Sequence, residues 1–260
     1  MSFWPSAYKA FPSTLSNEGY TDYPYLDDKG YVTVGQGNKI DNSDVAGINP
    51  AAPALALTWY DKNTNQTLSD DEVLAQWNAI KALQSMKDAG GGAFEPYSTM
   101  RLSQTSIQSL VQGMMDSMIA TLGKRLPAIG GWPADAQLAI LRWAWAFGPN
   151  ANFPLMFAEL KKVMPNFDGA VQQAELDQLN LPVKIDITHM FQNATDALDR
   201  DLDPSVLYWP GFPPGGGIGN LGFSVAGAVI GAGIGYVAYQ GFKTILEGVA
   251  AQPSTMKAKA

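Results

Sequence analysis

The chain has no cysteine and only one histidine, His189, among its 260 residues. Without cysteine it can form neither disulfides nor thiolate zinc sites, and it has no thiol nucleophile. A single histidine also argues against a Ser-His-Asp triad or a site with several histidine ligands. We therefore expect no metal and no other cofactor, and we expect any catalysis to use carboxylates, hydroxyls or amides. The Gly-rich run GGGIGNLG lacks the preceding strand and the following acidic residue of a dinucleotide-binding fold.

Basic charge is also scarce, with 17 Lys and Arg against 24 Asp and Glu and a net charge of -7. Such a balance disfavours binding to polyanions, so we expect no nucleic-acid partner. The first residues, MSFWPSAYKAF, lack a basic region followed by an apolar run. We therefore expect no secretory signal peptide.

Hydrophobic residues make up 46% of the chain and aromatic residues 11%, enough for a substantial core. The pattern is a small hairpin early and helices afterwards, which predicts an α+β fold dominated by helix. The helices are expected at 69–88, with Ser69 as N-cap, and at 103–122, 134–147, 154–163, 171–179 and 187–202.

The predicted hairpin is the segment YPYLDDKGYVTVGQG, in which two β-prone runs flank DDKG. Gly30 suits the left-handed position that ends such a turn. In the second strand Tyr31 and Thr33 are expected on one face and Val32 and Val34 on the other.

The composition changes after residue 207, and no charged residue occurs between Asp203 and Lys243. We divide the chain into a catalytic domain at 1–207, a Pro/Gly linker at 208–220, an apolar helix at 221–246 and a short tail at 247–260.

The apolar segment is long enough to span a hydrocarbon core of about 30 Å. Gly227, Gly231 and Gly235 recur every four residues, a pattern that allows close helix–helix association in membranes. We expect residues 221–242 to enter a membrane, with self-association through these glycines. Lysines follow the segment and acids precede it, which places the tail on the cytoplasmic side. A buried core helix or a flexible Gly-rich tail is the alternative.

Glu18, Asp27 and Thr33 form the candidate catalytic group. If Glu18 ends a helix and the hairpin folds back beside it, Asp27 and Thr33 face its carboxyl group. Two carboxylates across a sugar are the usual equipment of glycoside hydrolysis, where one donates a proton and the other holds water. The alternative is structural, since Asp is common in turns and Thr is common in strands.

The spacing Glu-x8-Asp-x5-Thr, with Gly19 after the Glu and GYVTVGQG around the Thr, resembles the catalytic signature of phage-type lysozymes, glycoside hydrolase family 24. A second block, LRWAWAFGPNANFP at 141–154, is similar to the buried helix at the centre of that family's helical lobe. Together the two blocks cover about residues 10–205.

The resemblance implies Glu18 as the general acid, with Asp27 and Thr33 positioning the attacking water. The substrate would be the MurNAc–GlcNAc β-1,4 bond of peptidoglycan. The fold would be lysozyme-like, with a small β-hairpin lobe, a larger helical lobe, a long helix joining them and a cleft between. Tyr31, Gln36, Asn38 and Asn193 are the expected substrate-binding residues.

The chain also departs from the family pattern. Asn38 stands where the family often has histidine, and Ala146 stands where it often has a polar amide. The family acid is often paired with an arginine from a late helix. Here Arg142 and Arg200 are candidates, and Gln192–Asn193 can occupy that place without the charge.

We therefore expect a muramidase, either associated with a phage virion or delivered to the bacterial periplasm as an effector. Three alternatives remain open. The first is a catalytically silent wall-binding protein with a lysozyme fold, and the second is a lytic transglycosylase. The third is a membrane-active toxin that acts through its Gly-rich segment. The presence of Asp27 and Thr33, which would position the attacking water, favours hydrolysis over the transglycosylase reaction.

Overall fold

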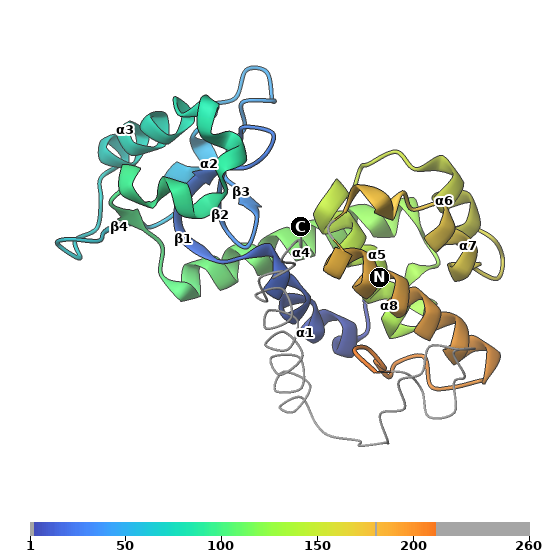
Figure 1. Ribbon diagram of the computed structural model, residues 1–260. Coiled ribbons are helices and arrows are strands. Elements are labelled where there is room, and N and C mark those ends of the chain that lie inside the picture. The colour runs from blue at the N-terminus through green and yellow to red at the C-terminus, as the bar shows by residue number, and fades with distance from the viewer. Residues whose placement is uncertain (1–2, 180, 212–260) are drawn as a thin grey trace, which may run out of the picture. The chain divides into compact units, whose positions relative to one another are not determined.

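The computed structural model describes residues 3–179 and 181–211, where a small antiparallel sheet is followed by helices (Figure 1). This confirms the predicted α+β class. The helices are α1 Pro5–Thr14, α2 Ala52–Leu55, α3 Asp70–Lys81, α4 Gln104–Arg125, α5 Ala134–Phe147, α6 Pro154–Leu160, α7 Phe167–Gln172 and α8 Leu181–Asp199. The strands are β1 Thr21–Leu26, β2 Val32–Gly35, β3 Asn38–Lys39, β4 Tyr60–Asp61 and β5 Met100–Arg101. Short 3-10 turns are Leu15–Glu18, Gln84–Ala89, Gly91–Tyr97, Ile129–Gly131 and Leu176–Gln178.

The predicted hairpin is confirmed as the pair β1 and β2, and β3 extends it into a three-stranded antiparallel sheet. Tyr25 lies opposite Thr33 in this register. The pairing is irregular between Thr21 and Tyr25, where Pro24 has no N–H to donate. Gly30 has a φ of +77° and takes the left-handed position expected of it.

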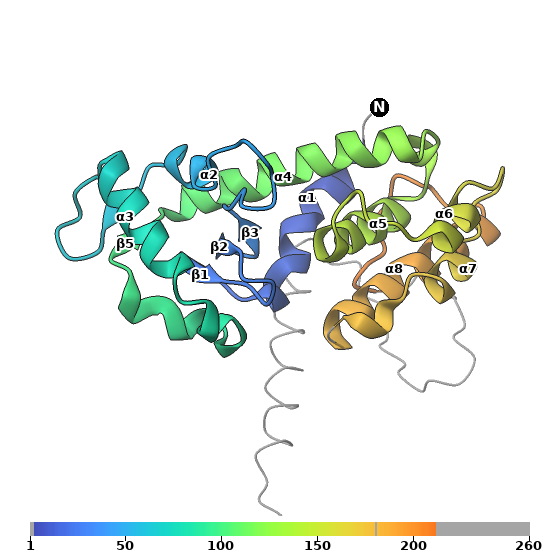
Figure 2. The ribbon, with the colours of Figure 1, turned by 90° about the horizontal axis from the view of Figure 1, so that it is seen from above.

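The buried apolar side chains form two clusters, and helix α4 contributes to both. Ile107, near the start of α4, packs with the three-stranded sheet and α3, whereas Val111, Met115 and Leu122 pack with α1 and α5. Figure 2 shows α4 along its length, with the strands beside its N-terminal part and α5 beside its C-terminal part. The sheet and the helices that follow α4 therefore have separate cores that share one helix.

Helix α5 is the centre of the larger cluster, and every side chain from Ala134 to Ala144 is buried. It packs against α1, α4 and α8. Most of its residues are apolar, as expected of a buried helix, and its buried polar residues Asp135, Gln137 and Arg142 all bond to other parts of the protein. It ends before Gly148, whose φ of +90° is a conformation that glycine adopts without strain. The predicted bounds 134–147 are confirmed.

Several predicted helices differ in extent from the structure. The helix expected at 103–122 is Gln104–Arg125, that at 154–163 ends at Leu160, and that at 187–202 runs from Leu181 to Asp199. Helix α3 begins after Ser69, whose side chain and that of Glu72 form a capping box, but it ends at Lys81. The Gln84 amide donates to the Lys81 carbonyl at 2.9 Å and so takes the place of the next helical bond. The helix predicted at 171–179 is instead α7, because the Asn166 side chain caps an earlier start by accepting the Gly169 N–H.

The first compact unit of the chain ends at Trp209, close to the predicted end at 207. The buried carboxylate of Asp135 in α5 accepts the backbone N–H groups of Tyr208 and Trp209 at 2.9 and 2.8 Å, which binds this end to the core. The predicted membrane helix at 221–246 lies outside the described residues. Within those residues, no helix combines the length and the apolar character needed to cross a membrane.

Candidate functional site

Glu18 lies where the helical start of the chain meets the sheet. It closes the 3-10 turn that follows α1, and Gly19 has a φ of +76° that lets the chain turn into β1. A residue with a Cβ would be strained at that angle, which explains the Glu-Gly pair. The Glu18 side chain is 25% exposed, so its carboxylate contacts solvent.

Arg142 is the partner of Glu18. Its Nη2 donates to Oε1 of Glu18, and its side chain is 0% exposed. The sequence left the partner open between Arg142 and Arg200, and the ion pair identifies Arg142. The arginine comes from the central helix α5 rather than from a late helix. Nε and Nη1 of Arg142 have no hydrogen-bond partner, so the guanidinium depends on Glu18 for a direct bond to an anion.

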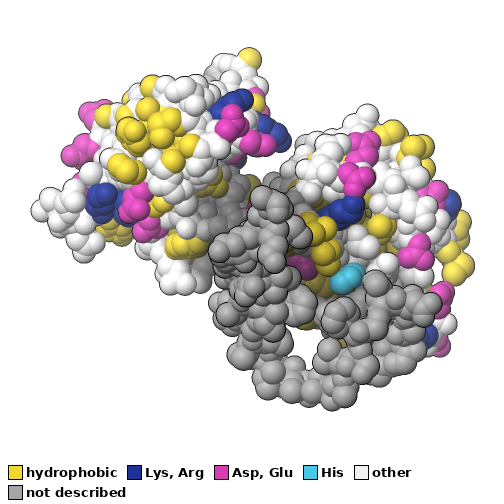
Figure 3. Space-filling model, viewed as in Figure 1, with side chains coloured by type: hydrophobic (Ala, Val, Ile, Leu, Met, Phe, Trp, Pro, Cys, Tyr) yellow, Lys and Arg dark blue, Asp and Glu magenta, His cyan; other side chains and the backbone are white. Residues whose placement is uncertain are grey.

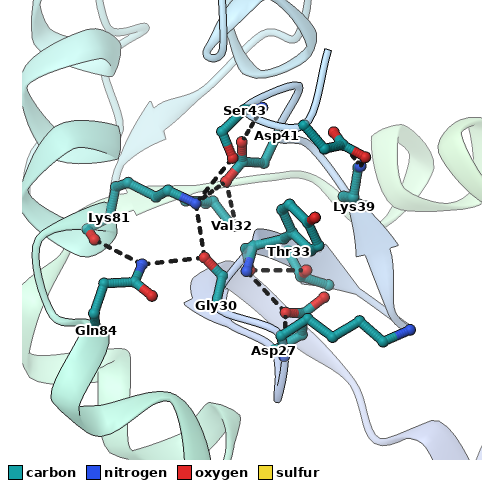
Figure 4. A network of polar contacts seen from close by, with 12 residues as sticks. Asp27, Gly30, Val32, Thr33, Lys39, Asp41, Ser43, Lys81 and Gln84 are labelled. Carbon is teal, nitrogen blue, oxygen red and sulfur yellow. Dashed lines mark hydrogen bonds and ion pairs between the residues drawn. The ribbon is translucent and has the colours of Figure 1, made fainter. Parts of the chain in front are cut away.

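Asp27 is held by the hairpin turn that it begins. Its Oδ1 accepts the N–H of Tyr31 at 2.8 Å and that of Lys29 at 3.0 Å (Figure 4). Its backbone N–H donates to the Tyr31 carbonyl, and its own carbonyl accepts the Gly30 N–H. Burial raises the pKa of Asp27, and the two N–H bonds to the carboxylate limit that rise. Asp27 is therefore a half-buried carboxyl group with a fixed orientation.

Tyr25 of β1 lies opposite Thr33 in the sheet, and sequence reasoning assigned it no role. Burial, together with the charges of Asp27 and Glu18, raises its pKa to about 12. The phenol thus lies within electrostatic range of both carboxyl groups. Side chains two apart in a strand share a face, so the spacing between Tyr25 and Asp27 was the available signal.

Thr33 lies opposite Tyr25 in the sheet, and its side chain is nearly inaccessible, with 2% exposure. Its hydroxyl donates to the Tyr31 carbonyl at 3.3 Å. The structure therefore places all three predicted catalytic residues on or beside the hairpin, with Thr33 the most deeply buried of them.

The four predicted substrate-binding residues have different surroundings. Tyr31 is partly exposed, with the Lys39 ammonium 4.3 Å from its ring centroid. Gln36 is also partly exposed, and its Nε2 donates to the Leu15 carbonyl at 3.4 Å. Both can reach a ligand.

Asn38 and Asn193 are fully buried, which does not suit the expected contact with substrate. The Asn38 amide oxygen accepts the Gln36 N–H, and its Nδ2 contacts the Met114 sulfur. Nδ2 of Asn193 donates to Asp135 at 3.0 Å. Both amides bond to buried groups of the protein, where an unbonded polar group would be destabilising.

Asp186 of α8 is a second carboxyl group near Arg142, and no sequence motif marked it. Its pKa is raised to about 6, because burial disfavours the carboxylate more than the Arg142 charge and a hydrogen bond from Trp209 favour it. The buried guanidinium therefore lies in the field of both Glu18 and Asp186.

Replacement of Asp186 by asparagine is expected to stabilise the protein at neutral pH. The unfolded carboxyl titrates near 3.8 and the folded one near 6, so ionising Asp186 removes stability as the pH rises through this interval. Asp186→Asn should raise the free energy of unfolding by about 2 kcal/mol at pH 7.5 and by little at pH 4, measured by urea denaturation. The exposed Asp177→Asn is the control. Equal effects of Asp186→Asn at the two pH values would contradict the assignment.

Charged groups of both signs are interspersed on the face seen in Figure 3. Among residues 3–179 and 181–211, no three acidic or histidine side chains gather closely enough to hold a metal ion. Comparison of the chain with protein-family models, with curated proteins and with solved structures yields no match. A functional conclusion must therefore be drawn from the residues of the site.

Proposed function

We propose that this chain is a muramidase that hydrolyses the MurNAc–GlcNAc β-1,4 bond of peptidoglycan. Glu18 is the general acid, and Asp27 with Thr33 positions the attacking water. The fold is then lysozyme-like, with the sheet and the helices after α4 as its two lobes. The spacing of Glu18, Asp27 and Thr33 and the glycines around them support this identification.

The observation that carries the proposal is the ion pair between Glu18 and the buried Arg142, next to the hairpin that holds Asp27. The pair restrains one carboxyl group at the edge of solvent, and two backbone N–H groups restrain the other. Two restrained carboxyl groups near one another are what acid and base catalysis at a glycosidic bond requires.

In the proposed reaction Glu18 acts as the neutral carboxylic acid, with Oε1 still accepting the bond from Arg142 Nη2. The proton on Oε2 passes to the glycosidic oxygen as the bond to the anomeric carbon breaks. Charge then develops on the sugar ring, and the Asp27 carboxylate accepts a proton from the water that attacks the anomeric carbon. Burial raises the pKa of Asp27, and the N–H bonds from Tyr31 and Lys29 oppose that rise by favouring the ionised form that a base needs.

A silent wall-binding protein is the second candidate, and the burial of Thr33, Asn38 and Asn193 favours it. Because the Thr33 hydroxyl and the amides of Asn38 and Asn193 are buried, fewer groups remain to bind water and sugar. Such a protein would bind sacculi without releasing soluble fragments. The membrane segment at 221–246 and delivery to the periplasm, from a virion or as an effector, also remain proposals from the sequence.

Digestion of purified sacculi tests the proposed function. The full chain and a chain ending at Trp209 are expected to release soluble muropeptides at similar rates, since the proposed catalytic residues all lie before that point. Binding of sacculi without release would support the silent protein instead. Leakage from lipid vesicles by the full chain, with no release from sacculi by either, would support a membrane-active toxin.

A further inference from the structure

Lys81, the last residue of α3, binds two separate parts of the hairpin segment. Its Nζ donates to the Gly30 carbonyl at 2.7 Å, to Asp41 Oδ2 at 2.7 Å and to Ser43 Oγ at 3.1 Å (Figure 4). An ammonium group has three N–H donors, and all three are used here. Gly30 precedes β2, and Asp41 and Ser43 follow β3. Because β2 and β3 are antiparallel, these residues lie at the same end of the strand pair, where one cation bonds to all three.

Asp41 completes this attachment from within the core. Its side chain is 0% exposed, and its carboxylate also accepts the N–H groups of Val32 at 3.0 Å and Ser43 at 2.7 Å. Burial opposes its ionisation, but the bonds from Lys81, Val32 and Ser43 outweigh burial and hold the pKa of Asp41 below its ordinary value. A buried carboxylate with this many donors is ionised and fixed in place.

Gln84 bonds to the same carbonyl as Lys81. Its Nε2 donates to the Gly30 oxygen at 3.1 Å. The φ of +77° at Gly30 favours glycine, and a Cβ there would displace the Gln84 side-chain oxygen, which would lie 2.2 Å away. The Gly30 carbonyl therefore accepts hydrogen bonds from two side chains at the C-terminal end of α3, Lys81 and Gln84.

The groups held by Lys81 and Asp41 adjoin the candidate catalytic residues. Tyr31, whose N–H binds the Asp27 carboxylate, directly follows Gly30. Val32, whose N–H binds Asp41, directly precedes Thr33. We infer that Lys81, acting with Asp41, is a positioning residue that holds Asp27 and Thr33 where they place the attacking water. This inference rests on the proposed function.

A displacement of about 1 Å in an active site can lower the rate on the order of 10²-fold. Lys81→Met in the full chain is therefore expected to lower kcat on soluble glycan strands by about 10- to 100-fold. KM should stay close to that of the wild type, because Lys81 is not expected to touch the sugar. Lys81→Arg, which keeps the positive charge and several donors, should recover much of kcat.

The matched control is Asp44→Asn, which breaks the exposed ion pair between Asp44 and Lys39 in the same segment. It should leave kcat unchanged, because exposed pairs of this kind contribute little. A second readout is amide hydrogen exchange at Tyr31 and Val32, which should accelerate in Lys81→Met and not in Asp44→Asn. A purely stabilising role would lower the melting temperature while kcat of the folded protein and exchange at these two amides stayed the same.

The outcomes separate this inference from the proposed function. In one outcome the wild type cleaves glycan strands, but Lys81→Met matches it in kcat or in amide exchange at Tyr31 and Val32. This result overturns the positioning role and leaves the proposed function standing. A wild-type chain that cleaves no glycan overturns the proposed function and the positioning role with it. A loss of kcat with faster exchange, recovered by Lys81→Arg, supports the inference.

Discussion

Replacement of Glu18 by glutamine is expected to lower the release of soluble muropeptides from sacculi by about 10²- to 10⁴-fold. Glutamine keeps the size of the side chain and can still accept a bond from Arg142, but it has no proton to give to the glycosidic oxygen. The rate is measured with the folded fraction of each protein determined in parallel. In this way loss of chemistry is distinguished from loss of folded protein.

The matched control for this experiment is Glu159→Gln. Glu159 lies in α6 and is also paired with a cation, Lys162, but this pair is at the surface. Glu159→Gln is expected to leave the rate within about twofold of the wild type, because Glu159 has no role in the proposed reaction. Its side chain is 23% exposed, close to the 25% of Glu18. Similar rates from Glu18→Gln and Glu159→Gln would contradict the assignment of Glu18 as the acid.

The second large effect concerns stability, since Glu18 is the anion directly bonded to a fully buried arginine. Glu18→Gln leaves the Arg142 charge buried, with Nε and Nη1 still lacking partners. Loss of one partner of a buried pair typically costs about 3–5 kcal/mol, and we expect about 3 kcal/mol here because glutamine can still accept one bond. Arg142→Met should cost less, because Glu18 is 25% exposed and remains in contact with water.

The double variant Glu18→Gln/Arg142→Met removes the buried charge and should recover most of the stability lost in Glu18→Gln. Denaturant unfolding gives all four free energies of this cycle. The measurement is best made at pH 5, where Asp186, with its pKa of about 6, is mostly protonated and offers Arg142 little compensating charge. If the double variant is no more stable than Glu18→Gln, the unpaired buried charge of Arg142 is not what destabilises Glu18→Gln.

The hairpin and α5 could be predicted because their signals are local. The run around DDKG fixes a turn at Gly30, and the unbroken apolar face of α5 together with Gly148 fixes that helix. The positions of Glu18 and Asp27 follow from these elements. Their resemblance to a known signature adds a role for each, and the structure adds the restraints that orient them.

The long-range partners could not be predicted in the same way. Arg142 was one of two candidates, and only the packing of α5 under the 3-10 turn selects it. Lys81 and Asp41 are 40 residues apart, and the sequence around each one predicts only an ordinary charged residue at the surface. The resemblance implied that Asn38 and Asn193 contact the substrate, but their burial depends on neighbours far along the chain.

The most direct test of hydrolysis by Glu18 and Asp27 is mass spectrometry of the muropeptides released by the full chain in water enriched in ¹⁸O. Hydrolysis predicts reducing muramyl ends that carry one ¹⁸O atom from the attacking water, with the label absent when Glu18→Gln is used. Anhydro-muramyl ends without label would show a transglycosylase reaction in place of hydrolysis. Equal yields of labelled reducing ends from the wild type and from Glu18→Gln would contradict the account.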